Sequence, residues 1–359
     1  MSGIVGDNTG ENSGQIVAVQ GATTSGSDPT TSTNPSGGAG TMFVNTSSGE
    51  MYICTDATAG ANVWTNVGGG TGDIQPFPGS NYGYTSGGYK TGPTYYNVVD
   101  KFSFTSDGNA TDVGDLTAAR FGGGTQSSAT HGSYSGGNTG SFSNVIDNFP
   151  FASDTNASDV GDLTVSRSNL CGQSSSTHGY SAGGRTSGNE DEIDKFSFSA
   201  GGNAADVGNL SVARACTAGQ SSSTYGYASC SYPSSDVIDK WLFSSDGNAS
   251  DVGNLTVARD FAAGSSSVTY GYTSGGLAAG TDVIDKFSFS SDGNATDVGN
   301  LSSARGDVGG QSSLTYGYTS GGKSPESDVI DKFSVSSDGN ASDVGNLTVA
   351  RWAVSGQHY

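Results

Sequence analysis

One pattern of about 46 residues recurs six times between residues 82 and 359, and it constrains the fold more than any other feature of the chain. Its clearest copy, residues 270–305, reads YGYTSGGLAAGTDVIDKFSFSSDGNATDVGNLSSAR. The arginines that close the copies are Arg120, Arg167, Arg214, Arg259, Arg305 and Arg351. The aspartates of the VIDKF segment keep the same spacing, at Asp100, Asp147, Asp194, Asp239, Asp285 and Asp331. Such a period is typical of repeat architectures.

Each copy predicts four short strands. TYGYTSG and DVIDKFSFS alternate between aromatic or β-branched residues and small or polar ones, which is a strand pattern. Between the third and fourth strands, the Asp-Gly of SDGN predicts a primed hairpin turn, because such turns need positive φ angles. No helical period is present. We therefore expect an antiparallel meander with the strands RxxxxGQ, YGYTSGG, DVIDKFSFS and ATDVGNLT.

Six such units predict an all-β chain that forms a six-bladed β-propeller. Residues 352–357, WAVSGQ, match the strand that opens a unit, whereas the first unit begins at Tyr82 on its second strand. The C-terminal strand is therefore expected to complete the first blade, which removes the open edges of the ring. The alternative is an open β-solenoid, which would not need its last copy to supply what its first copy lacks.

The segment before the repeats has a different composition. Residues 1–40 are rich in Gly, Ser, Thr and Asn and predict a flexible arm or assembly segment. Residues 41–70 predict a small β-meander that serves as an attachment module. It is too small to be stable alone, so we expect it to pack on copies of itself, on the propeller or on a larger assembly. Residues 71–81 would be a linker to the propeller at 82–359.

Charge and cysteine usage exclude several classes of protein. The net charge of −20 would repel phosphate backbones, so nucleic acid is not an expected partner. No apolar run approaches the roughly 20 residues that span a bilayer, so no membrane insertion is expected. The four cysteines form no CxxC pair and predict reduced thiols in a protein assembled inside a cell.

The repeat resembles the kelch repeat in the order of its elements: a double glycine that closes a strand, a variable loop, a hydrophobic strand with an acidic residue, and a terminal arginine. The resemblance implies a kelch-like propeller. Kelch units usually carry a tryptophan on the fourth strand. The residues at that position here are Val113, Val160, Val207, Val252, Val298 and Val344.

A second resemblance comes from segments outside and inside the repeats. MSGIVGDNTGENSG, GTMFVNTSSGEMYICTD and NVWTNVGGG resemble segments at the front of structural proteins of tailed bacteriophages, especially marine ones. The repeated DKFSF and GNATDVG resemble predicted phage appendage proteins. The resemblance implies a virion protein, such as a tail fibre, assembled in the host cytoplasm. Its N-terminal region would bind other virion proteins and could form a homo-oligomer.

No catalytic site is expected. Six of the seven arginines close repeats, so only Arg185 is free and the arginine triad of a sialidase cannot be built. His131 and His178 occupy a position that sister repeats fill with tyrosine, which indicates packing. A glycan-active propeller enzyme therefore remains a remote alternative. No cofactor or metal is expected.

The alternative is that the repeats bind calcium. Asp246, Asn248 and Asp251 supply oxygens at short spacing, and most repeats have equivalents. Asp and Asn in turns more often bond their own backbone. The framework aspartates and arginines are expected to be structural, each Asp pairing with a repeat-closing Arg or with backbone amides in its own or an adjacent blade.

The copies differ most in the loop after the double glycine. Loops on a rigid scaffold often carry recognition, so this face is the candidate binding surface. Its candidate residues are Tyr89, Tyr95, Tyr96, Arg185, Tyr232 and Lys323. The alternative is that these are surface loops without a function. Two hypotheses follow: an appendage whose propeller binds a host surface protein or glycan, or an architectural decoration or fibre spacer that binds no receptor.

Overall fold

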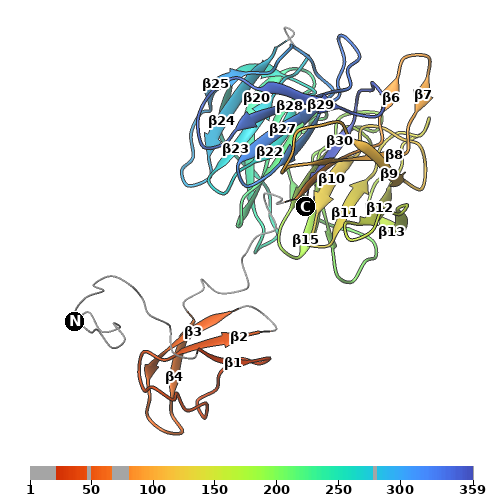
Figure 1. Cartoon of the computed structure of the whole chain (residues 1–359). Coiled ribbons are helices and arrows are strands. Elements are labelled where there is room, and N and C mark those ends of the chain that lie inside the picture. Colours follow the sequence, from red (N-terminus) through yellow and green to blue (C-terminus); the bar gives the residue numbers. More distant parts are fainter. Residues whose placement is uncertain (1–21, 47–49, 67–80, 278–280, 359) are drawn as a thin grey trace. The chain divides into compact units, whose positions relative to one another are not determined.

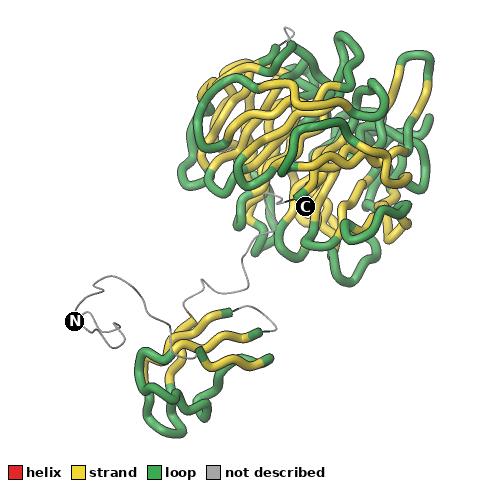
Figure 2. Tube along the Cα trace, viewed as in Figure 1, coloured by secondary structure: helices red, strands yellow, loops and turns green. Residues whose placement is uncertain are grey.

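The computed structural model describes residues 22–46, 50–66, 81–277 and 281–358 (Figure 1). These residues form strands, turns and bends but no helix (Figure 2). None of them therefore belongs to a helix long and apolar enough to cross a membrane. The chain divides into two compact units, Met1–Gln75 and Pro76–Tyr359. The fold is all-β and propeller-like.

The first unit holds a four-stranded sheet. Its strands are β1 (Thr23–Ser25), β2 (Met42–Asn45), β3 (Met51–Asp56) and β4 (Val63–Asn66). They lie in the order β1-β2-β3-β4, with β1 parallel to β2 and the other pairs antiparallel. Phe43 is buried and packs edge-to-face on Trp64, at a centroid distance of 5.5 Å. The expected small meander corresponds to β2, β3 and β4.

Residues 22–40 differ from the expected flexible arm. β1 pairs with β2, and the amide of Asn45 donates to Asp28 at 2.7 Å. The indole N–H of Trp64 donates to the carbonyl of Thr33 at 3.1 Å. The polar composition suggested disorder, but polar side chains of the sheet bind the backbone and side chains of this segment and order it. The rest of the expected arm, residues 1–21, and nearly all of the expected linker, residues 71–80, lie outside the described residues.

In the second unit, the described residues form six four-stranded antiparallel sheets and one small hairpin. The first sheet contains β30 (Ser355–His358), β5 (Tyr82–Ser86), β8 (Val98–Ser103) and β9 (Thr111–Asp115), and the hairpin contains β6 (Tyr89–Lys90) and β7 (Thr94–Tyr95). The second contains β10 (Gly124–Ser127), β11 (His131–Ser135), β12 (Val145–Pro150) and β13 (Ser158–Asp162). The third contains β14 (Cys171–Ser174), β15 (His178–Ala182), β16 (Glu192–Ser197) and β17 (Ala205–Asn209).

The other three sheets repeat this order. The fourth contains β18 (Ala218–Ser221), β19 (Tyr225–Ser231), β20 (Ser235–Leu242) and β21 (Ser250–Arg259). The fifth contains β22 (Ala263–Ser266), β23 (Tyr270–Ser274), β24 (Val283–Ser288) and β25 (Thr296–Asn300). The sixth contains β26 (Gly309–Ser312), β27 (Tyr316–Ser320), β28 (Val329–Ser334) and β29 (Ser342–Asn346). The four strand types follow the sequence pattern of each copy.

The last strand of the chain pairs with the first repeat. β30 runs antiparallel to β5, with Gln357 opposite Tyr84 and His358 opposite Gly83. The sheet order is β30-β5-β8-β9, so the strand missing from the first copy comes from the C-terminus. Hydrogen bonds of one ladder thus join segments more than 250 residues apart in the sequence.

The core lies between consecutive sheets. A typical cluster combines Tyr272, Ile284 and Leu301 of the fifth sheet with Phe333 of the sixth. Both faces of each sheet are covered, which is why Ile284 and its neighbour Asp285 are both fully buried. Burial of one such apolar side chain contributes about 1.5–3 kcal/mol.

The SDGN segment differs from the expected primed hairpin turn. In the fifth repeat the strands end at Ser288 and resume at Thr296, which leaves a longer loop. Its Asp292 pairs with Lys240 of the preceding sheet. A Cβ atom on Gly253 of that sheet would clash with the carbonyl of Gly293. The segment therefore serves as a joint between sheets, a role that its local sequence does not reveal.

Five equivalent Lys–Asp pairs join consecutive sheets across the described residues: Lys101–Asp154, Lys195–Asp246, Lys240–Asp292, Lys286–Asp338 and Lys332–Asp107. Between the second and third sheets, Asn148 and Gly201 stand at the two positions. The lysine and its aspartate are thus both replaced at the same junction, as expected for two residues that act as a pair.

These pairs are expected to contribute little to stability. In a double-mutant cycle of Lys286→Met and Asp338→Ala, measured by urea unfolding, we expect a coupling energy of about 0.2–1 kcal/mol that falls in high salt, because the Asp338 side chain is 59% exposed. A coupling of several kcal/mol, insensitive to salt, would contradict this expectation.

Candidate functional site

The framework residues form buried ion pairs between one repeat and the next. The pairs are Arg120–Asp147, Arg167–Asp194, Arg214–Asp239, Arg259–Asp285, Arg305–Asp331 and Arg351–Asp100. In each, the arginine that closes one copy meets the aspartate of the following copy, and Arg351 of the last copy meets Asp100 of the first. All twelve side chains are at most 3% exposed. These residues are committed to structure and are not free to bind a ligand.

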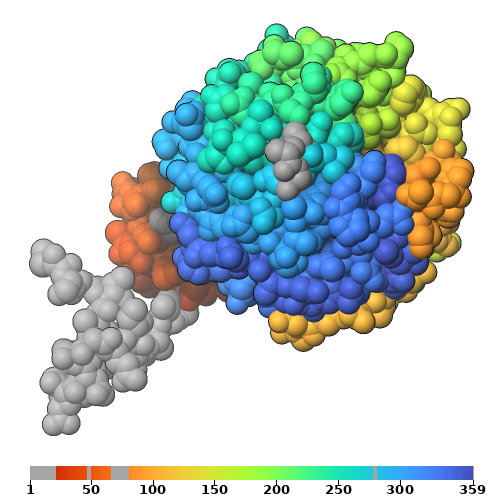
Figure 3. Space-filling model, turned by 90° about the horizontal axis from the view of Figure 1, so that it is seen from above, coloured from red at the N-terminus to blue at the C-terminus, as the bar shows by residue number. Residues whose placement is uncertain are grey.

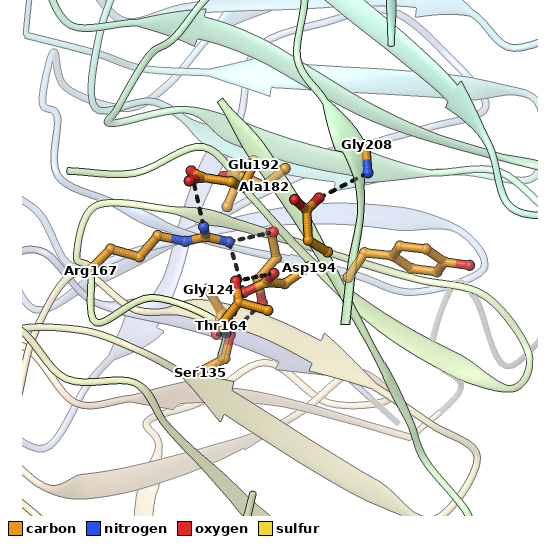
Figure 4. Close-up of polar contacts among 12 residues, drawn as sticks. Gly124, Ser135, Thr164, Arg167, Ala182, Glu192, Asp194 and Gly208 are labelled. Carbon is orange, nitrogen blue, oxygen red and sulfur yellow. Dashed lines mark hydrogen bonds and ion pairs between the residues drawn. The ribbon is translucent and has the colours of Figure 1, made fainter. Parts of the chain in front are cut away.

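Figure 4 shows one of these pairs. Arg167 lies 3.2 Å from Asp194 and donates to the carbonyl of Ser181 at 3.1 Å. The hydroxyl of Thr164 donates to the other Asp194 oxygen at 2.6 Å. Glu192 adds a second carboxylate 3.4 Å from Arg167, where the other copies carry valine. Each charge is thus compensated by partners from the neighbouring repeat.

The first strands of the sheets surround an axial cavity of about 130 Å³. It is lined by equivalent positions of β10, β14, β18, β22, β26 and β30, which are Thr125, Gly172, Gly219, Gly264, Gly310 and Gly356. Five of the six positions are glycine, and at Gly264 a Cβ atom would clash with the backbone of Gly219. The small residues bring the six strands close together around the cavity.

A cycle of backbone hydrogen bonds lies at one end of this cavity. The residue two positions after each repeat-closing arginine donates its N–H to the carbonyl of its equivalent in the preceding repeat, at 2.5–3.1 Å. We call these the ring residues: Gly122, Asn169, Cys216, Phe261, Asp307 and Ala353. The cycle returns to its start, because Gly122 donates to Ala353. All six ring residues line the cavity.

The ring residues adopt a backbone conformation that favours glycine. Their φ angles lie between 50° and 66°. This left-handed conformation costs residues with a Cβ atom about 1–2 kcal/mol, and aromatic residues seldom adopt it. Five of the six copies nevertheless carry a side chain there, and all six residues differ, although the strands around them repeat almost verbatim. Strain that persists at a diversified position indicates a functional site.

Sequence reasoning missed these positions, although a signal was present. The two residues after the repeat-closing arginine read FG, SN, AC, DF, GD and WA in the six copies. They vary as much as the loop after the double glycine, but they lie within the segment RxxxxGQ, which the sequence pattern predicts as a strand. Only the structure shows that they surround the cavity mouth.

The structure brings four of the sequence-predicted site residues to this mouth. Tyr89, Arg185, Tyr232 and Lys323 occupy equivalent positions just after the double glycine or its equivalent. Each donates its backbone N–H, at 2.7–2.8 Å, to the residue that follows a repeat-closing arginine. The acceptors are Trp352, Ser168, Ala215 and Gly306. The predicted residues therefore form a second layer outside the ring residues.

An aromatic cluster forms one sector of the mouth. Tyr89 lies 4.6 Å from Trp352 and 5.3 Å from Phe121 between ring centroids, and Tyr95 stacks on Phe121 at 5.6 Å. The ammonium of Lys323 lies 4.3 Å from the Trp352 ring centroid. On another sector, Arg185 lies over Tyr232 at 5.8 Å, and Tyr232 is 44% exposed.

Tyr96 differs from the other predicted tyrosines. It is half-buried, and its backbone N–H donates to the carbonyl of Gly88 at 2.9 Å. Its ring makes no aromatic contact with the other residues in the described ranges. The structure therefore does not place Tyr96 with the aromatic cluster.

Asp307 is the main electrostatic feature of the cavity. It is 5% exposed, and its carboxyl group makes no hydrogen bond or ion pair with any of the described residues. Burial raises the pKa of this carboxyl to about 7; nearby Lys323 opposes the rise and Asp260 adds to it. Lys323 is not within ion-pair distance, because its ammonium lies over Trp352. A buried acid without compensation is rare in a purely structural role.

The residues considered for calcium are engaged elsewhere. Asp246 pairs with Lys195, Asn248 accepts the N–H of Asn209 at 3.1 Å, and Asp251 accepts that of Gly253 at 3.1 Å. Across the described ranges, no group of three or more acidic, histidine or cysteine residues is arranged to hold a metal ion. The acidic loops thus serve as joints and turns.

No protein-family model matches this sequence, and no curated protein is similar enough to it to show a relationship.

Proposed function

We propose that the second unit is a six-bladed, kelch-like β-propeller closed by β30. Three observations support closure: the hydrogen-bond cycle of the ring residues, the pairing of β30 with β5, and the buried Arg351–Asp100 pair. In Figure 3 the segments follow one another around the visible face in sequence order, and the orange first repeat lies beside the blue last one.

The two ends of the ring have different roles in this proposal. Asn81 directly precedes β5, and the register places Gly83 opposite His358, so the chain enters and leaves the sheet at the same end. The opposite end, after Ser86, carries the loops, the ring residues and the aromatic cluster. The end with the most varied residues is thus opposite to the end of the first sheet at which Asn81 and His358 lie, and this observation carries the proposal.

The chain would act as a structural virion protein, a tail fibre or other appendage of a bacteriophage. Its N-terminal unit would attach it to other virion proteins, and the loop end would bind a host surface receptor or glycan. Support comes from the resemblance of the N-terminal and repeat segments to phage appendage proteins. The half-buried Tyr89 and Tyr95, the exposed Tyr232 and the cations that lie over aromatic rings suit sugar stacking and hydrogen bonding.

Adsorption competition tests this proposal. Excess full-length protein is expected to block adsorption of the particles that carry it. The variant Arg185→Ala/Tyr232→Ala, at the loop end, is expected to compete at least about tenfold less well, since aromatic and arginine residues dominate binding energies. The control Val268→Ser changes a residue that is 72% exposed at the opposite end and should compete like the parent protein.

The alternative is the architectural role, in which the propeller is a spacer or decoration. Absence of competition at saturating folded protein would support that role and contradict receptor binding. Equal competition by the loop-end variant and the parent would place the binding surface elsewhere on the molecule.

A further inference from the structure

The axial cavity contains a chemical group that the fold itself does not need. Asp307 lines the cavity with a nearly fully buried carboxyl group that has no hydrogen-bond partner in the described part of the chain. In five other repeats the same backbone position is filled by Gly, Asn, Cys, Phe or Ala, so no framework role requires an acid there. A buried carboxylate is stabilised by a cation or by several hydrogen-bond donors.

The surroundings of Asp307 favour an organic cation over a metal ion. The ring residue of the preceding repeat is Phe261, which also lines the cavity and whose carbonyl accepts the Asp307 N–H at 2.8 Å. Its ring centroid lies 6.4 Å from that of Tyr232. Aromatic faces attract ammonium groups. The acidic Asp260 directly precedes Phe261 and acts electrostatically on Asp307. Metal binding would need several more oxygen ligands, and the described residues show no such cluster.

The cavity has the size and access that a small ligand needs. Its volume of about 130 Å³ exceeds that of one water molecule several-fold. Asn169 and Phe261 at the mouth are half-buried, so the cavity reaches solvent at the loop end. The aromatic cluster with Lys323 lies beside this opening and would contact the part of a ligand that remains outside.

We propose that the cavity mouth binds the primary ammonium group of an amino sugar, with the Asp307 carboxylate as the counter-ion and Phe261 against the ammonium. The sugar ring would stack on the aromatic side chains around the mouth. This inference names the class of ligand for the proposed glycan site. It rests on the proposed function in one respect, that the loop end is the end that binds ligands. It does not require the chain to belong to a virion.

Calorimetric titration of the full-length protein at pH 7.5 tests the inference. Glucosamine is expected to bind, whereas N-acetylglucosamine, which has no ammonium group, is not. Asp307→Asn is expected to weaken glucosamine binding at least about tenfold, the loss typical of one hydrogen bond to a charged group. The matched control Asp206→Asn, at an exposed aspartate on β17, should bind like the parent protein.

A second readout separates direct contact from a structural effect. At pH 6 the amine of glucosamine is almost fully protonated, and the Asp307 carboxyl, with its pKa of about 7, is mostly protonated as well. Binding at this pH should release protons, because the ammonium favours the ionised Asp307. Asp260, Lys323 and Cys216 are the other titratable groups that interact electrostatically with this carboxyl. Titrations in two buffers of different ionisation enthalpy measure the release, and Asp307→Asn should abolish it.

Several results would overturn the inference. These are no glucosamine binding by folded parent protein, equal binding by Asp307→Asn, or equal binding of N-acetylglucosamine. Ethanolamine distinguishes the source of the ammonium: binding as tight as that of glucosamine would overturn the amino-sugar assignment in favour of a lipid headgroup. Glucosamine binding without any adsorption competition would contradict the host-receptor proposal and leave this site intact.

Discussion

Replacing Asp285 with alanine is expected to lower the free energy of unfolding by about 3–5 kcal/mol. Asp285 is fully buried and lies 2.9 Å from Arg259. It also accepts the backbone N–H and the hydroxyl of Thr256, at 3.0 and 2.6 Å. The alanine variant leaves the Arg259 guanidinium buried without its counter-ion. Urea unfolding of the full chain, monitored by intrinsic fluorescence, measures the change.

The exposed Asp297 is the matched control for this prediction, because it lies opposite Asp285 on the neighbouring strand. Asp297→Ala is expected to cost about 1 kcal/mol or less, the value of its one hydrogen bond to the Gly299 N–H. In the double variant Arg259→Met/Asp285→Leu, much of the lost stability should return, since no unpaired charge remains. Unchanged unfolding of Asp285→Ala would contradict a structural role for the repeated Asp and Arg.

Replacing Asp307 with asparagine is expected to stabilise the protein by an amount that grows as pH rises above about 4 and is largest above pH 7. The folded-state pKa of about 7 lies above the unfolded-state value near 4, so the folded protein binds more protons between these values. Stability therefore falls as pH rises from about 4 to about 7, and the penalty is complete above pH 7. A gap of about three pH units corresponds to roughly 4 kcal/mol. We expect Asp307→Asn to recover most of this at pH 8 and little at pH 4.

The backbone at this position accommodates asparagine. Asn169 is the equivalent ring residue, with φ 56° against 55° for Asp307, so the substitution introduces no new strain. Thermal and urea unfolding at pH 4, 6 and 8 measure the difference, with Asp206→Asn as the control that should show no pH-dependent gain. An equal effect at all three pH values, or destabilisation at pH 8, would show that Asp307 has a structural partner. Stabilisation combined with loss of ligand binding would show a residue retained for function at the expense of stability.

The strands and their order could be predicted from the repeat because they depend on local patterns. The alternation of VIDKFS and YGYTS fixes which segments are strands, and the match of residues 352–357 to the opening strand predicts where β30 pairs. The turn chemistry of SDGN was less reliable. Its Asp-Gly is a hairpin signal in isolation, but backbone contacts with the preceding sheet, such as the Ala341 N–H that donates to the Asn300 carbonyl at 2.8 Å, hold the segment as a longer loop.

The candidate site could be predicted only in part. The variable loops can be recognised because the six copies can be compared within one chain. Tyr89, Arg185, Tyr232 and Lys323 each donate a backbone N–H to the residue that follows a repeat-closing arginine. The sequence does not predict that Asp307 and Phe261 lie close together. They belong to repeats about 46 residues apart, and no pattern within a single repeat shows which residues of neighbouring repeats will be in contact.

The sequence by itself determined the repeat, the strand pattern within it and the positions at which the copies differ, since each depends on residues close together in the chain. Only the tertiary structure decided which arginine meets which aspartate, that residues 22–40 join the small sheet, and that the residues after the arginines form one ring. These features depend on contacts between distant segments. Contacts between the last and first repeats bury Arg351 against Asp100, and contacts among the repeats enclose Asp307, where burial raises the pKa of its carboxyl.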